Sequence, residues 1–202
     1  PLSDLGNWRY EGVIYRKTDD PANRDGSACL FAPDVTVGPD KRYYLYYSLN
    51  SLPVVSVAVS DHPTGPYDFY GYVSYPDGTR LEPQFDPSVL TEGNTVYLYT
   101  GFCLPDDKDR SGAMVTVLEP DMLTVRTKPS FVLPNKPYSA GSGFEGFEFF
   151  EAPSIRKRGD LYYLIYSSVQ MYELCYATSK EPTAGFTYGG VIISNNDLGI
   201  QT

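Results

Sequence analysis

The chain has 202 residues, with 25 acidic and 16 basic side chains and a formal net charge of −9. This balance argues against non-specific binding to nucleic acid, which requires Lys and Arg to neutralise phosphates, and against an anionic membrane surface as a partner. The hydrophobic content of 42% is that of a folded globular chain, and no apolar run approaches the roughly 18 residues of a transmembrane helix. Three dispersed Cys and one His argue against a zinc site.

The chain is divided into short segments by 18 Gly and 17 Pro. No segment carries apolar residues at helical spacing over three turns, whereas several are rich in Tyr, Val, Ile and Leu, as β-strands are. We therefore predict an all-β chain, with strands at residues 42–48, 54–60, 95–100, 113–118, 161–167 and 174–178.

A repeat runs through these segments. Residues 31–35, 85–89 and 151–155 read Phe-Ala-Pro-Asp-Val, Phe-Asp-Pro-Ser-Val and Glu-Ala-Pro-Ser-Ile, and a Tyr-rich strand follows each at matching spacing. A second repeat aligns residues 57–65 with residues 176–185, and each copy is followed by a segment with an aromatic residue next to Gly. Each unit reads as a four-stranded antiparallel meander of about 50–65 residues, the size of a propeller blade.

We predict blades at residues 28–75, 85–133 and 150–193, with the end of an earlier blade at 1–16. The alternative is a β-sandwich whose spacings match by coincidence. Three copies with nearly the same spacing favour the propeller, and no Gly-His…Trp-Asp signature of the WD40 type is present.

Carboxylates stand within two residues of the Pro that opens each predicted inner strand: Asp34, Asp86 and Glu151. Acids that share one end of a propeller channel repel one another and lose solvation, which separates their pKa values. Glycoside hydrolysis needs such a pair, one carboxyl protonated and one ionised. Phe31 is expected to form a wall of the site, because aromatic faces suit the apolar faces of sugar rings.

The spacing of these acids also raises an objection. Asp86 lies one residue before its Pro and Glu151 lies two before, so along an extended strand their side chains point to opposite faces. Either the opening turn reorients one of them, or one is outside the site. The structural alternatives are that Asp86 starts a turn, Asp34 caps one, and Glu151 is a solvated loop charge.

These motifs, with residues 60–67 and 149–157, resemble glycoside hydrolase family 43 over essentially the whole chain. The resemblance implies a five-bladed β-propeller, of which this chain holds about three blades and the end of a first. It implies inverting hydrolysis of α-L-arabinofuranosides, β-D-xylosides or both in plant cell-wall polysaccharides. Glu151 would be the general acid and Asp86 the carboxylate that raises the pKa of that acid and orients it. Phe31 and Asp34 would form the wall and floor of the sugar subsite.

Some features of that family have no counterpart here. Its general base, an Asp on the first blade, would precede Pro1, and Asp4 does not take that role. Its axial His, often beside calcium, would follow Thr202, and His62 does not match it. We therefore expect an internal fragment whose ring is completed by further blades or a partner chain, with no metal site of its own and no required cofactor.

Two other functions remain open. A non-catalytic glycan-binding propeller would have no base at all, and an inverting glycoside phosphorylase would need a basic phosphate pocket, whereas these motifs are acidic. In each case the expected partner is an oligosaccharide or polysaccharide. The compartment stays open, with no signal peptide visible after Pro1.

Overall fold

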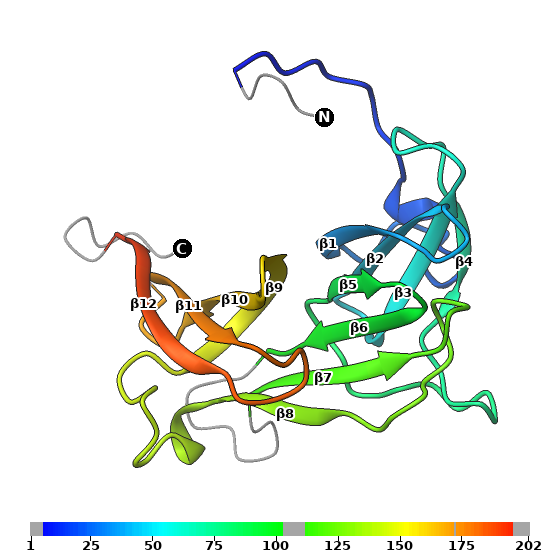
Figure 1. The fold of residues 1–202 in the computed structure, drawn as a ribbon. Helices are drawn as coiled ribbons and strands as arrows, with labels where there is room; N and C mark the ends of the chain where they lie inside the picture. Colours follow the sequence, from blue (N-terminus) through cyan, green and yellow to red (C-terminus); the bar gives the residue numbers. More distant parts are fainter. Residues whose placement is uncertain (1–5, 103–111, 172, 196–202) are drawn as a thin grey trace.

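A computed structural model describes residues 6–102, 112–171 and 173–195. The described chain forms three four-stranded antiparallel sheets, which follow one another in sequence and lie along an arc (Figure 1). The prediction of an all-β chain built from meander repeats is confirmed. The strands are β1 (Leu30–Val37), β2 (Tyr43–Leu49), β3 (Leu52–Ser60) and β4 (Asp68–Tyr72) in the first sheet; β5 (Ser88–Glu92), β6 (Thr95–Thr100), β7 (Gly112–Leu118) and β8 (Ser130–Pro134) in the second; and β9 (Phe149–Arg158), β10 (Leu161–Ser168), β11 (Glu173–Ser179) and β12 (Thr187–Ser194) in the third.

Each sheet places its first strand innermost. The strand β5 lies against β1 on one side and against β9 on the other, while β4, β8 and β12 lie at the periphery (Figure 1). The three turns that carry the Pro motifs therefore meet at one end of the inner strands, as a propeller requires.

Outside the sheets, the described residues include three short 3₁₀ turns, at Lys17–Asp19, Pro21–Asn23 and Lys136–Tyr138. Residues 6–16 form no strand, and their assignment to the end of a first blade stays a prediction. None of the helices in the described parts of the chain is long and apolar enough to cross a membrane.

The Tyr-rich second strand of the first sheet, β2, is buried on both faces. In β2, Tyr44 and Tyr46 pack into the cluster between the first and second sheets, whereas Leu45 and Tyr47 pack under residues that precede β1. A strand covered on both sides reads as an almost continuous apolar run, which is how the sequence of β2 reads. In β2, Tyr44 and Tyr46 therefore pack the first sheet against the second, whereas Tyr47 packs against the segment before β1.

Two tyrosine hydroxyls also join neighbouring sheets. Tyr46 Oη donates to the carbonyl of Met122 at 2.6 Å, and Tyr99 Oη donates to the carbonyl of Pro182. The two tyrosines occupy the same register, since Tyr46 pairs with Asp34 and Tyr99 pairs with Ser88. The same polar link thus repeats from the first sheet to the second and from the second to the third.

Candidate active site

The Pro of each of the three motifs (Pro33, Pro87 and Pro153) follows a residue with a positive φ angle. This φ is +46° at Ala32, +49° at Asp86 and +55° at Ala152. Positive φ is uncommon for residues other than Gly, although Asp tolerates it comparatively well. The strand pairing shifts its register at this point in β1 and β9, as at a β-bulge. Side chains before the Pro therefore do not follow the simple alternation of a strand.

The bulge resolves the objection raised by the spacing of the two acids. Asp86 occupies the positive-φ position, whereas Glu151 immediately precedes the positive-φ residue of its own strand. The carboxylate Oδ2 of Asp86 accepts a hydrogen bond from the backbone N–H of Ala152 at 3.2 Å, which brings Asp86 next to the residue after Glu151. The structure therefore brings the two carboxyls together from neighbouring sheets.

The electrostatics of Asp86 and Glu151 are those of a coupled pair. Burial, together with the negative charge of Glu151, raises the pKa of Asp86 to about 6, against a smaller lowering effect of the Ala152 N–H. Burial also raises the pKa of Glu151. Two interacting carboxyls of this kind titrate together, so the last proton belongs to the pair. The pKa values of both carboxyls are therefore raised above their usual range.

A row of four phenylalanines borders the two carboxyls. Ring centroids are 6.1 Å apart between Phe31 and Phe85, 5.9 Å between Phe85 and Phe102, and 5.6 Å between Phe102 and Phe150. Phe102 also pairs through its backbone with Glu151. Phe31 lies at the open end of the row with 43% of its surface exposed, where a ligand can reach its face.

Asp34 contacts both of the other sheets. Its Oδ2 accepts hydrogen bonds from Ser88 Oγ at 2.8 Å and from the N–H of Val89 at 3.0 Å. Its Oδ1 faces Arg156 Nη2 at 3.4 Å. Both carboxylate oxygens of Asp34 therefore already have protein partners.

A cavity of about 210 Å³ has Asp34 and Asp86 among its lining residues. All three Pro motifs line it, with Arg156 at one side. An apolar groove of about 370 Å³ is lined by Phe85, Phe102 and residues 49–53, which connect β2 to β3. Asp86 lines the cavity and Phe85, the residue before it in the chain, lines the groove.

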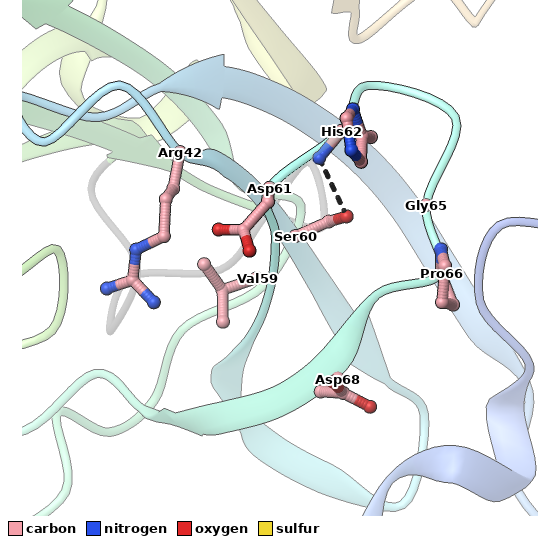
Figure 2. Close-up of a pocket in the computed structure, with 8 residues that line it drawn as sticks. All are labelled: Arg42, Val59, Ser60, Asp61, His62, Gly65, Pro66 and Asp68. Atoms are coloured by element: carbon pink, nitrogen blue, oxygen red, sulfur yellow. Dashed lines mark hydrogen bonds between the residues drawn. The ribbon is translucent and has the colours of Figure 1, made fainter.

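A third hollow, at the far end of the first sheet, has a different character. It is lined by Arg42, Ser60, Asp61, His62 and Asp68 among others, around the turn from β3 to β4 (Figure 2). It lies at the opposite end of this sheet from the bulge.

The one strong cation of this third hollow is already engaged by the protein. The guanidinium of Arg42 donates to Asp40 at 2.7 Å and to a Tyr44 hydroxyl at 2.9 Å. His62 is exposed at the surface, as the sequence predicts. We therefore place the candidate site at the inner strands.

No group of three or more His, Cys, Asp or Glu side chains that could hold a metal ion occurs in residues 6–102, 112–171 and 173–195. The expectation that no cofactor is required stays a prediction.

Of the four residues predicted from the sequence, the structure brings Asp86 and Glu151 together and places Phe31 at the exposed end of the aromatic row. Asp34 lines the same cavity as Asp86 and accepts a hydrogen bond from Ser88. Their functional roles stay predictions. Sequence reasoning missed Phe85 and the role of Ser88, although their positions in the aligned motifs could have suggested both. Phe102 carried no such signal, because it is brought to Glu151 only by the fold.

Comparison with known proteins identifies the family of this chain. Residues 3–191 match the family described as glycosyl hydrolases family 43. A xylosidase/arabinosidase of Thermoclostridium stercorarium is 69% identical over 208 residues, covering 100% of this chain and 44% of that protein. A xylosidase/arabinosidase of Bacteroides ovatus is 30% identical over 219 residues, covering 94% of this chain and 63% of that protein. The chain thus spans 44% and 63% of the length of these two relatives.

Two solved glycosidase structures are similar to this chain in fold. The β-xylosidase RS223 has a TM-score of 0.71 and 26% identity, over 91% of this chain and 62% of its own. An α-L-arabinofuranosidase of Clostridium thermocellum has a TM-score of 0.71 and 25% identity, over 98% of this chain and 62% of its own. The predicted fold class, an all-β chain of the five-bladed propeller type that holds about three blades, is confirmed. With a family match over residues 3–191, the chain belongs to glycoside hydrolase family 43.

Proposed function

We propose that the protein carrying this chain hydrolyses α-L-arabinofuranosides, β-D-xylosides or both, with inversion at the anomeric carbon. The observation that supports this most is the pairing of Asp86 with Glu151 beside an aromatic row. Membership of a glycoside hydrolase family and the names of the two relatives, both xylosidase/arabinosidase, point to the same substrates.

In this proposal Glu151 is the general acid. It is more exposed than Asp86, which is only 6% exposed, so a glycosidic oxygen can approach Glu151 more easily. Burial raises the pKa of Glu151, which is the direction of shift that a general acid needs. Asp86 supplies the negative charge beside it and stays bonded to Ala152.

The inverting mechanism needs a second carboxylate that activates water from the opposite face of the sugar, about 6.5–9.5 Å from the acid. We assign that base to no residue of this chain. The part assigned to the three sheets is to hold the acid, its charged neighbour and the apolar wall around the sugar.

The role of Glu151 is tested by Glu151→Gln in the complete protein, with Glu145→Gln as the control. Glu145 is an exposed carboxylate six residues earlier in the chain. Loss of a general acid typically lowers kcat by about 10²–10⁴-fold when the leaving group is a sugar. A dinitrophenyl glycoside needs no protonation as it leaves, so its turnover should fall far less.

The comparison of leaving groups decides the assignment. An equal loss on xylobiose and on the dinitrophenyl glycoside would contradict the role of Glu151 as an acid, as would full activity on both. If the unaltered protein binds xylo-oligosaccharides without cleaving them, the proposed hydrolysis is wrong and a glycan-binding propeller is the better interpretation. The configuration of the first-formed sugar, read by proton NMR, tests inversion separately.

A further inference from the structure

We propose that Asp34, Ser88 and Arg156 form a clasp across the three inner strands, and that Ser88 is its central positioning residue for the pair of Asp86 and Glu151. The inference deepens the proposed function and rests on it for its consequences in catalysis. Its structural part, the coupling of Ser88 to the backbone beside Glu151, can be tested without any turnover.

Ser88 occupies the middle of the clasp because its hydroxyl has two partners. Ser88 Oγ donates to Asp34 Oδ2 in the first sheet at 2.8 Å and accepts the N–H of Ile155 in the third sheet at 3.0 Å. A hydroxyl can donate and accept at once, which neither a carboxylate nor an ammonium group can do. Ser88 is 1% exposed, so water does not readily replace either partner.

Arg156 closes the clasp into a ring. It follows Ile155 in β9, and its Nη2 lies 3.4 Å from Asp34 Oδ1. The path from Ile155 through Ser88 and Asp34 therefore returns to β9 through Arg156. Because Arg156 is exposed, this last contact is the weakest of the ring.

The same type of link occurs at both boundaries between sheets. The side chain that follows the Pro in one sheet accepts the N–H of the second residue after the Pro in the next. Asp34 accepts from Val89 at 3.0 Å, and Ser88 accepts from Ile155 at 3.0 Å. The repetition indicates that these links set the spacing between successive inner strands.

This spacing bears directly on the carboxyl pair. Two side-chain hydrogen bonds join the start of the second sheet to β9: Asp86 to Ala152 at 3.2 Å, and Ser88 to Ile155 at 3.0 Å. Ser88 lies two residues after Asp86, and Ala152 directly follows Glu151. If the shorter and more buried bond of Ser88 is lost, β9 is free to shift, and Glu151 shifts with it relative to Asp86.

The first measurement is amide hydrogen exchange at Ala152 by NMR, in the complete protein. Ser88→Ala should speed exchange at Ala152 by at least about five-fold, although the acceptor of that amide, Asp86, is untouched. Ser88→Thr keeps the hydroxyl and should leave exchange within about two-fold of the unaltered protein. The matched control is Ser56→Ala, which removes a buried hydroxyl that has no hydrogen-bond partner in the described structure.

The second measurement separates positioning from mere stability. Ser88→Ala should lower kcat by about ten-fold with little change in KM, since a misplaced acid slows the chemical step. Ser88→Thr should restore kcat, and Ser56→Ala should not change it. Rates are referred to the folded fraction, so partial unfolding alone cannot produce the effect.

Three outcomes would overturn the proposal: unchanged exchange at Ala152 in Ser88→Ala, unchanged kcat per folded molecule, or a Thr variant as impaired as the Ala variant. If Ser88→Ala does not fold, Ser88→Cys provides a graded version, because a thiol is a weaker donor and acceptor. If the protein hydrolyses no glycoside, the exchange measurement still decides the clasp while the proposed function fails by itself.

Discussion

At the scale of one residue, Asp86 has features that lower the stability of the folded protein but serve the proposed reaction. It adopts a positive φ, is 6% exposed, and faces another carboxyl. Each of these features is unfavourable for a folded protein. Together they place a charge beside the acid that the proposed reaction needs, as perturbed carboxyls at functional sites do.

The pKa of Asp86 predicts how stability depends on pH. Its pKa is raised from 3.8 to about 6 in the folded protein, so the folded state binds the proton more tightly than the unfolded chain does. The free energy of unfolding is therefore greatest below pH 3.8 for this group, and it decreases as the pH rises through about 6. At neutral pH the cost is of the order of 3 kcal/mol at most.

Removal of this charge should stabilise the protein at neutral pH. We expect Asp86→Asn to raise the free energy of unfolding by about 1–3 kcal/mol at pH 7.5, with a smaller gain at pH 4.5 and a loss of activity. Urea denaturation at the two pH values measures this, with Asp61→Asn as the control at an exposed carboxylate. A gain equal at both pH values would contradict the explanation.

At the scale of the element, the feature that matters is the positive φ of the residue directly before the Pro of each motif. Ala32, Asp86 and Ala152 share a positive φ directly before Pro, although a Pro normally pushes the preceding residue to extended conformations. This positive φ is present in the first sheet too, where Ala32 bears no functional group. It is therefore a property of the repeated motif, and the site makes use of it.

This conformation predicts an inversion of the usual preference of strands for β-branched residues. Ala32→Val should lower the free energy of unfolding by about 1–2 kcal/mol, because Val is strongly disfavoured at positive φ. Ala32→Gly should be neutral or stabilising. Thr178→Val, at a regular position of β11, serves as the control and should be close to neutral. Thermal or urea unfolding tests this; a stabilising Ala32→Val would refute it.

At the scale of the whole molecule, contacts at the interfaces between neighbouring sheets hold the three sheets together. Apolar clusters fill both interfaces, and the hydroxyls of Tyr46 and Tyr99 form hydrogen bonds across them. At the other end of the inner strands, Glu92 of the second sheet accepts from Lys157 at 2.6 Å and from Tyr162 at 2.5 Å. The sheets are thus tied at several heights along their inner strands.

The hydrogen bonds between sheets should contribute measurably to the free energy of unfolding. Tyr46→Phe should lower the free energy of unfolding by about 1–2 kcal/mol, because the carbonyl of Met122 is left buried without its partner. The m-value, which is the slope of the free energy of unfolding against denaturant concentration, should not change, since the same surface is exposed on unfolding. Tyr43→Phe in the same strand is the control, at a partly exposed ring. Equal effects of the two substitutions would argue against the role of the hydroxyl.

Much of the fold was predictable from the sequence. The ranges expected for six strands agree with the observed strands β2, β3, β6, β7, β10 and β11 to within a few residues. Strand signals are local, because side chains alternate with a period of two and Gly and Pro interrupt them. The repeat of the Pro motif likewise predicts that Asp34, Asp86 and Glu151 gather at one end of the inner strands, because equivalent positions of successive blades lie side by side.

Only the tertiary structure decided which residues meet. Asp86 and the N–H of Ala152 are 66 residues apart in sequence, Ser88 and the N–H of Ile155 are 67 apart, and their contacts depend on how one sheet packs on the next. The alternation rule placed Asp86 and Glu151 on opposite faces, and a positive φ at each motif overrides that rule. The sequence by itself determined the strands and their repetition, because these follow from neighbours along the chain. The geometry of the site follows from the bulges and from the interfaces between sheets, which exist only in the folded molecule.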